Sequence, residues 1–269
     1  QYECIIFPNV PCLSQQAVRN IKSYVRNGGN IIATFETSLY DEFGEALENF
    51  QLAEVFGMEH TGSVFGTLRK DFISLEDHSH FSVKQINQRF TYAPTYGLKL
   101  KAGSDTHIPV VYCKPLPGRY AGAPEPSMHP FLAEHHYGKG TSVYISGTFG
   151  GSLYKFHFPE YYQILHNLVR ELHAPVVRLH DAPTSVEVNV RRNGDAYFVY
   201  LINFTSDMRR PIQSIIPCAD IGVEFHLDAK VKSVRTLWRK KELKFKTQDN
   251  WVRVELDVLE DYDVLEFRI

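Results

Sequence analysis

Hydrophobic and polar residues follow two different periods in the first 35 positions of the chain. The apolar run Cys4–Phe7 is typical of a strand that is buried on both faces. In residues 15–27 the apolar side chains fall at helical spacing, between an N-cap at Ser14 and a stop at Gly28-Gly29. Residues 30–35 are again apolar, so the order strand, helix, strand predicts a right-handed crossover with parallel strands. This pattern indicates an α/β layer.

The pattern is less regular from residue 36 to residue 174. Residues 63–137 lack a long helical period and contain proline-rich turns, so we expect an irregular, β-rich insertion at the sheet edge. The pattern predicts, in order, a short helix ending at Gly57, strands at 97–101 and 108–114, a hairpin over 131–146, and a helix over 159–173.

The pattern changes from mixed to strand-only after Pro175. Val186, Val188 and Val190 alternate with polar residues up to Asn193-Gly194, a pair that favours a type I′ hairpin turn. Further strands are predicted at 231–238, 243–246, 251–256 and 263–269. We therefore expect two domains, an α/β domain over residues 1–174 and a small antiparallel β-sandwich over residues 175–269.

Composition excludes several classes of protein. With 269 residues and 43% hydrophobic residues, the chain is long and apolar enough to bury a core. Lys and Arg number 29 against 31 Asp and Glu, without a basic block, so nucleic acid is not an expected partner. The apolar runs are much shorter than the roughly 20 residues that span a bilayer, so a membrane is not expected either.

Cysteines and the N-terminus bear on localisation. The four cysteines have no CxxC spacing, which favours a reducing compartment and hence the cytoplasm. A strand-like run begins within three residues of Gln1, so we expect an N-terminally truncated domain. Any targeting segment would then lie upstream.

A hydrolase on such a sheet needs a nucleophile on a sharp turn between strand and helix. Ser38 is the only hydroxyl near that position, and it lacks the flanking glycines that such a turn requires. We therefore expect no catalytic residue in this chain and interpret Ser38 as a loop or capping serine.

Histidines and carboxylates provide two other candidate sites. The Asp77–His80 segment and the His135-His136 pair with His129 lack a third ligand at diagnostic spacing, so we expect exposed loop histidines, no metal and no cofactor. Glu36, Asp41, Glu42 and Glu45 follow the second strand at the sheet's carboxyl edge, where α/β folds collect ligands.

The acidic loop is either solvated or in contact with a ligand or a neighbouring subunit. Trp238 and Trp251 have the side chains to stack on a sugar ring, but they lie on alternating strands where an indole is more often part of the core.

In their order and spacing, these segments resemble the trimerisation domain of family 42 β-galactosidases and related glycoside hydrolases. The resemblance covers most of the chain and is weakest from Ser63 to Pro130. It rests on Tyr2–Val10, Leu13-Ser14, Tyr24-Val25, Gly28–Thr34, Thr37-Ser38, Asp41–Gly44, Leu52–Gly57, Tyr137–Gly140 and Val143–Ile145.

This resemblance implies a flavodoxin-like fold, similar to class I glutamine amidotransferases, that has lost its nucleophile. It also implies self-association, an upstream β/α-barrel domain with the catalytic glutamates, and loops that help to wall a neighbour's active site. Glu36, Ser38, Asp41 and Glu42 would be contacts with a ligand or subunit.

The function predicted from sequence is therefore a non-catalytic, oligomerising region of a glycoside hydrolase in carbohydrate metabolism. Two alternatives remain open: a carbohydrate-binding or scaffolding module, and an independent hydrolase that uses Ser38 or an acidic loop residue.

Overall fold

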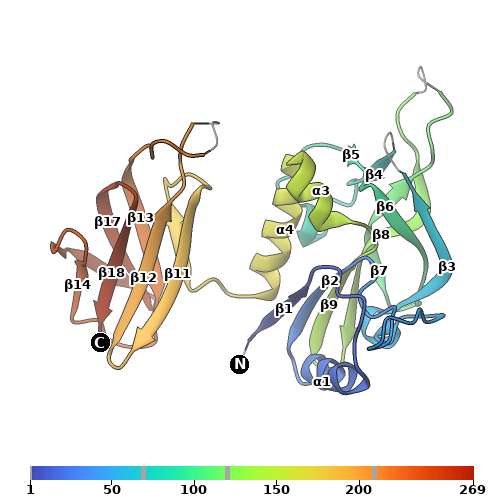
Figure 1. Cartoon of the computed structure of the whole chain (residues 1–269), viewed down its shortest axis with the longest axis horizontal. Coiled ribbons are helices and arrows are strands. Elements are labelled where there is room, and N and C mark those ends of the chain that lie inside the picture. The colour runs from blue at the N-terminus through green and yellow to red at the C-terminus, as the bar shows by residue number, and fades with distance from the viewer. Residues whose placement is uncertain (1, 68–70, 119–121, 208–210) are drawn as a thin grey trace. The chain divides into compact units, whose positions relative to one another are not determined.

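The computed structural model describes residues 2–67, 71–118, 122–207 and 211–269. The chain divides into two compact units, Gln1–Ala174 and Pro175–Ile269, which are drawn in Figure 1. The expectation of two domains, over residues 1–174 and 175–269, stays a prediction. Within the described residues there are eighteen strands and four α-helices.

The first unit holds all four of these helices. They are α1 (Gln15–Arg26), α2 (Ala53–Phe56), α3 (Phe149–Phe156) and α4 (Pro159–Leu172), with a short 3₁₀ turn η1 (Phe81–Val83). Its strands are β1 (Cys4–Phe7), β2 (Asn30–Thr34), β3 (Met58–Gly66), β4 (Phe72–Ser74), β5 (Phe90–Tyr92), β6 (Tyr96–Ala102), β7 (His107–Cys113), β8 (Pro126–Tyr137) and β9 (Gly140–Ile145).

Seven of these strands form one mixed sheet, in the order β1-β2-β9-β8-β7-β4-β5. Strands β1, β2 and β9 are parallel to one another, while each later neighbour pairs antiparallel. Strands β3 and β6 make a separate antiparallel pair. Much of residues 63–137 thus joins the sheet or this pair, although residues 68–70 and 119–121 lie outside the described part.

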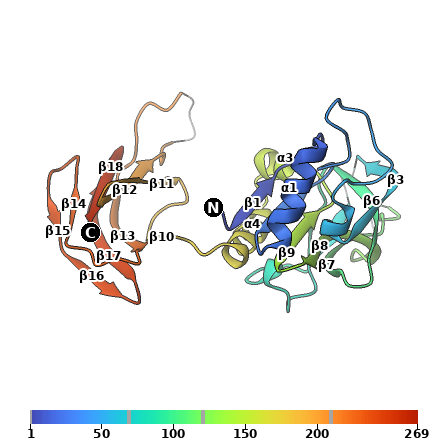
Figure 2. The ribbon, with the colours of Figure 1, turned by 90° about the horizontal axis from the view of Figure 1, so that it is seen from below.

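The predicted unit of strand, helix and parallel strand is confirmed as β1, α1 and β2, and α4, which follows β9 in the chain, packs on the opposite face. Helix α1 begins after Ser14, whose Oγ accepts the Ala17 N–H at 3.2 Å. Its buried residues pack with Ile31 of β2, whereas Ile32 faces the other way and packs with Ile164 and Leu168 of α4. In Figure 2, α1 covers the near face of the sheet and α4 lies beyond it.

The expected fold class, a flavodoxin-like α/β domain followed by a small antiparallel β-sandwich, is wrong. A doubly wound sheet needs a crossover helix after nearly every strand, and here α1 alone connects adjacent parallel strands within the described residues. The sheet then continues by antiparallel pairing through β8, β7, β4 and β5. The described chain is consequently a mostly β protein.

The second unit contains strands only, among the residues that the structure describes. One antiparallel sheet has the order β10-β13-β17-β16 and another β11-β12-β18-β14-β15, and a shared apolar core packs residues of both. The strands are β10 (Val177–His180), β11 (Val186–Asn193), β12 (Ala196–Asn203), β13 (Cys218–His226), β14 (Ser233–Thr236), β15 (Glu242–Leu243), β16 (Phe245–Gln248), β17 (Trp251–Leu259) and β18 (Tyr262–Arg268).

The helices of the described residues are short relative to the thickness of a bilayer. None of them is long and apolar enough to cross a membrane.

Candidate functional site

The turn after β2, where a hydrolase would carry its nucleophile, is held closed by side-chain hydrogen bonds. Thr34 Oγ1 accepts the Asn9 N–H at 2.9 Å, and Thr37 Oγ1 accepts the Val10 N–H at 3.1 Å while donating to Thr34 O at 2.7 Å. These contacts fasten the loop after β1 to the turn after β2. The turn therefore joins two strand ends rather than presenting a hydroxyl to solvent.

Ser38 is fully buried in this turn. Its Oγ accepts the Leu52 N–H at 3.3 Å, and its carbonyl accepts the Gln51 N–H at 2.9 Å. The hydroxyl thus anchors the segment that leads into α2 from a position 14 residues earlier in the chain. Contact between Ser38 and a ligand or a neighbouring subunit would require this packing to open.

The acidic residues of the same loop have three different environments. Glu36 is half-buried, and its charge, together with burial of the phenol, raises the pKa of Tyr40. Asp41 Oδ1 accepts the N–H groups of Phe43 and Glu45, both at 2.9 Å, which closes an Asx-type turn. Glu42 is exposed at the tip of this turn.

Phe43, next to Glu42, is 84% exposed. The turn around Asp41 fixes the backbone on both sides of this ring, so a large apolar side chain stands on an ordered loop. Sequence reasoning did not single out Phe43. The available signal was an aromatic residue between Glu42 and Gly44, at a position with no helical or strand period to bury it.

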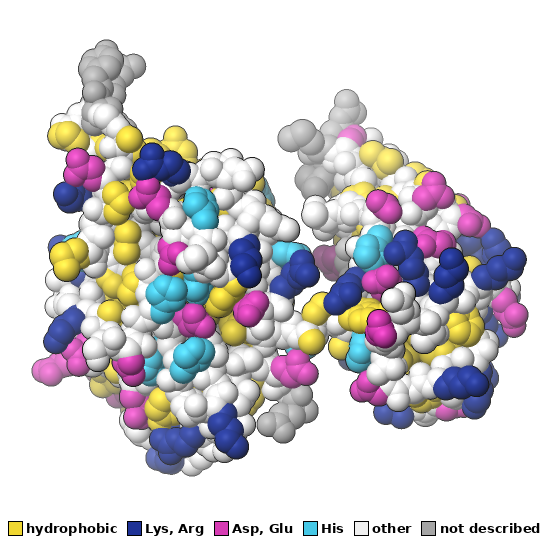
Figure 3. All heavy atoms as spheres, turned by 180° about the vertical axis from the view of Figure 1, so that it is seen from behind, with side chains coloured by type: hydrophobic (Ala, Val, Ile, Leu, Met, Phe, Trp, Pro, Cys, Tyr) yellow, Lys and Arg dark blue, Asp and Glu magenta, His cyan; other side chains and the backbone are white. Residues whose placement is uncertain are grey.

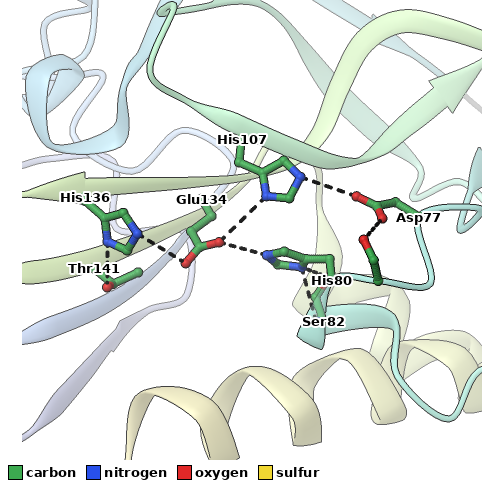
Figure 4. Close-up of polar contacts among 8 residues, drawn as sticks. Asp77, His80, Ser82, His107, Glu134, His136 and Thr141 are labelled. Carbon is green, nitrogen blue, oxygen red and sulfur yellow. Dashed lines mark hydrogen bonds and ion pairs between the residues drawn. The ribbon is translucent and has the colours of Figure 1, made fainter.

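A second group of polar side chains gathers where β4, β7 and β8 meet (Figure 4). We call it the His–Glu cluster; it consists of Asp77, His80, His107 and Glu134. His107 is the first residue of β7 and lies directly opposite Glu134 of β8 in the strand register. Asp77 and His80 come from the loop after β4, and the His80 ring caps η1 by accepting the Ser82 N–H at 3.2 Å.

One carboxylate is the centre of this cluster. Glu134 Oε2 lies 2.8 Å from His80 Nε2 and 3.9 Å from His107 Nδ1, and Glu134 Oε1 lies 3.9 Å from His136 Nε2. The hydrogen bond from His80 is the main cause that holds the pKa of Glu134 below its usual value, against the opposing effect of burial. His107 Nε2 in turn lies 3.3 Å from Asp77 Oδ2.

The expectation of exposed loop histidines is wrong for His80, which is 6% exposed, and for His135, which is also buried. His78 is exposed and lies outside the cluster, so only the first and last residues of the motif Asp77–His80 belong to the cluster. Spacing along the chain does not reveal the contact between His107 and Glu134, because it depends on the pairing register of β7 and β8.

The two tryptophans of the second unit differ in environment. Trp238 is 58% exposed, with its ring centroid 5.0 Å from that of Tyr262, so the expectation of a core indole is wrong there. The Arg178 guanidinium lies 3.9 Å from the ring centroid of Trp251, which covers that ring. Carbohydrate binding by these residues stays a prediction.

Comparison with known proteins gives one family and a group of similar folds. Residues 1–172 match the family described as the β-galactosidase trimerisation domain. A β-galactosidase from Bacillus circulans sp. alkalophilus has a TM-score of 0.66 at 16% identity, covering 100% of this chain and 33% of its own. A GH42 β-galactosidase from G. stearothermophilus gives 0.64 at 19% identity, with 100% and 32% covered.

An α-L-fucosidase isoenzyme from Paenibacillus thiaminolyticus has a TM-score of 0.75 at 16% identity, covering 99% of this chain and 41% of its own. Identities at this level show a shared fold. The chain spans about a third of the length of the two β-galactosidases.

Proposed function

The chain belongs to the β-galactosidase trimerisation domain family over residues 1–172, and on that premise we propose that it is the non-catalytic, self-associating region of a glycoside hydrolase. The family match is the observation that carries this proposal. Its partners would be further copies of itself and a β/α-barrel domain that holds the catalytic carboxylates.

The turn after β2 supports a non-catalytic role. A nucleophile needs an exposed hydroxyl or thiol with backbone N–H groups free to stabilise an oxyanion. Here the hydroxyl of Ser38 is buried and accepts the Leu52 N–H, and the backbone N–H of Ser38 donates to Val10 O at 3.0 Å. Both groups are therefore occupied in holding the loop together and are not free for catalysis.

The loop that carries Phe43 supports contact with a neighbouring subunit. Aromatic side chains are frequent anchors at protein interfaces, and a fixed loop loses little conformational entropy on binding. Asp41 shapes this loop through two backbone hydrogen bonds, and exposed Glu42 beside Phe43 can pair with a basic residue at the rim. We assign Glu36 the role of supporting Tyr40 at the loop's base.

Replacing the exposed aromatic ring tests this contact. We expect Phe43→Ser to weaken self-association at least tenfold, about 1.4 kcal/mol, because the ring would be buried only between subunits. The melting temperature of dilute protein should stay unchanged, since Phe43 makes little of the monomer core. Sedimentation velocity over a range of concentrations measures the effect.

Tyr154→Ser is the matched control, because Tyr154 is 83% exposed on α3 and lies outside the loop. If both variants weaken self-association equally, or if Phe43→Ser does not weaken it, this loop is not part of the interface. Hydrolysis of an aryl glycoside by the chain of residues 1–269, lost on a single substitution in it, would contradict the non-catalytic role.

A further inference from the structure

We propose that His80, His107 and Glu134 bind a divalent transition-metal ion, with zinc as the best match. The ligand atoms would be His80 Nε2, His107 Nδ1 and Glu134 Oε2. This inference is independent of self-association and goes beyond the proposed function.

The spacing of the three ligand atoms suits a small ion. They all lie within 4.8 Å of one another, and Glu134 Oε2 is 2.8 Å from His80 Nε2 and 3.9 Å from His107 Nδ1. Zinc binds nitrogen and oxygen at about 2.0–2.2 Å, which separates neighbouring tetrahedral ligands by about 3.3 Å. The Glu134–His80 pair would move apart and the Glu134–His107 pair would move together to reach that separation, and the two histidine nitrogens already lie within 4.8 Å of each other.

The placement of His107 between two carboxylates is the observation that points to a cation. Its Nε2 lies 3.3 Å from Asp77 Oδ2, and its Nδ1 lies 3.9 Å from Glu134 Oε2. A cation between Nδ1 and Glu134 Oε2 would be attracted by the carboxylate and by the lone pair of a neutral ring. A carboxylate behind a ligating histidine is also the usual way in which proteins orient such a ligand.

His80 has a partner for its second nitrogen in either protonation pattern. Without an ion, Nδ1 accepts the Ser82 N–H at 3.2 Å and Nε2 donates to Glu134. With an ion on Nε2, the proton moves to Nδ1, where Ser82 Oγ lies 2.8 Å away and accepts it. Loading therefore requires a change of tautomer, in which Nε2 exchanges its hydrogen bond to Glu134 for the ion and Nδ1 exchanges the Ser82 N–H for Ser82 Oγ.

The charge and accessibility of the cluster also fit a divalent ion. The Glu134 carboxylate and the nearby Asp77 carboxylate carry two negative charges together, which one divalent ion neutralises. His80 is buried, whereas the His107 side chain is 54% exposed, so water can complete a tetrahedral set. Figure 3 shows histidine and carboxylate side chains side by side on one face of the first unit.

Calorimetric titration with zinc chloride at pH 7 tests the site in the chain of residues 1–269 after treatment with a chelator. We expect one zinc ion per chain and a higher melting temperature in its presence. His107→Ala and Glu134→Gln should each weaken binding at least tenfold, and Asp77→Asn by about 10- to 100-fold. His78→Ala, an exposed histidine of the same loop, should bind as the wild type does.

Two results would overturn the assignment. One is wild-type binding no tighter than about 1 mM, which would mean that the cluster is a hydrogen-bonded network and no metal site. The other is zinc binding that survives His107→Ala but is lost in Cys12→Ser, which would place the ion on an exposed thiol. Circular dichroism of each variant separates loss of the site from loss of the fold.

Discussion

At the scale of single residues, Asp263 is the most unusual carboxyl group in the second unit. Its Oδ1 accepts the Val264 N–H at 2.7 Å and the Trp238 N–H at 3.3 Å. Its Oδ2 is buried and has no hydrogen-bond partner among the described residues. Burial raises the pKa of this group, and the two backbone hydrogen bonds only partly offset the effect.

We expect Asp263→Asn to stabilise the protein at pH 7 by about 1 kcal/mol, because a buried unpaired charge costs more than a buried amide. The folded-state pKa of Asp263 lies above its unfolded value, so protonation favours folding. Protonation of Asp263 stabilises the folded wild type fully below the unfolded-state pKa of about 3.9, and this contribution is lost as the pH rises through the folded-state pKa.

The difference in free energy of unfolding between wild type and Asp263→Asn should therefore shrink as the pH falls, and urea titrations between pH 4 and pH 8 measure it. Asp261→Asn, an exposed neighbour, serves as the control and should show no such trend. A constant difference across this range would mean that Asp263 is not held at a raised pKa.

Single residues were predictable from sequence where a local pattern decides their place. Ser14 was predicted as an N-cap directly before a helical period, and its Oγ accepts the Ala17 N–H at the start of α1. Trp238 is exposed because it lies in a bend after β14 has ended at Thr236. The pairing of His107 with Glu134 depends on strand register, which a one-residue shift would change. The proposed metal site was accordingly invisible in the spacing of histidines along the chain.

At the scale of elements, the close approach of α1 to β9 depends on a glycine. A Cβ added at Gly140 would lie 2.1 Å from Gly29 O and 2.4 Å from Val25 O. Both carbonyls belong to the backbone where α1 ends and the chain turns into β2, so neither moves without displacing the helix. The contact thus links the predicted hairpin of β8 and β9 to the predicted crossover.

We expect Gly140→Ala to destabilise the first unit by about 2 kcal/mol, since the added methyl group forces the backbone apart. Gly150→Ala is the matched control. Gly150 lies in α3, and a Cβ added there would meet no described atom within 4 Å outside its own helix, so alanine should stabilise the helix by about 0.5–1 kcal/mol. Urea unfolding followed by far-ultraviolet circular dichroism measures both changes.

If Gly140→Ala unfolds at the same urea concentration as the wild type, the end of α1 does not lie close enough to β9 to exclude a methyl group at residue 140. The two glycine variants are expected to shift the midpoint in opposite directions, so a general effect of alanine is excluded by the comparison.

Several elements were predicted from sequence to within a residue or two. Helix α1 was predicted over 15–27 and is found at Gln15–Arg26, and α4 was predicted over 159–173 and is found at Pro159–Leu172. These segments carry strong helical periods and caps. The fold class was wrong because local pattern does not show which strands become neighbours, and β8, β7, β4 and β5 join the sheet antiparallel.

At the scale of the whole molecule, the family match links this chain to a domain described by its self-association. The order of short motifs along the sequence indicates the same family. Neither the hydrophobic pattern nor the net charge of −2 predicts an oligomer by itself. An interface resembles the rest of the surface in its average composition, so only particular residues such as Phe43 suggest its place.

The mass of the chain in solution, measured by sedimentation equilibrium at several concentrations, is the direct test of self-association. We expect reversible association towards three copies of the 30.9 kDa chain as the concentration rises, with closed symmetry and no larger species. A mass of one chain at every concentration up to the millimolar range would contradict it.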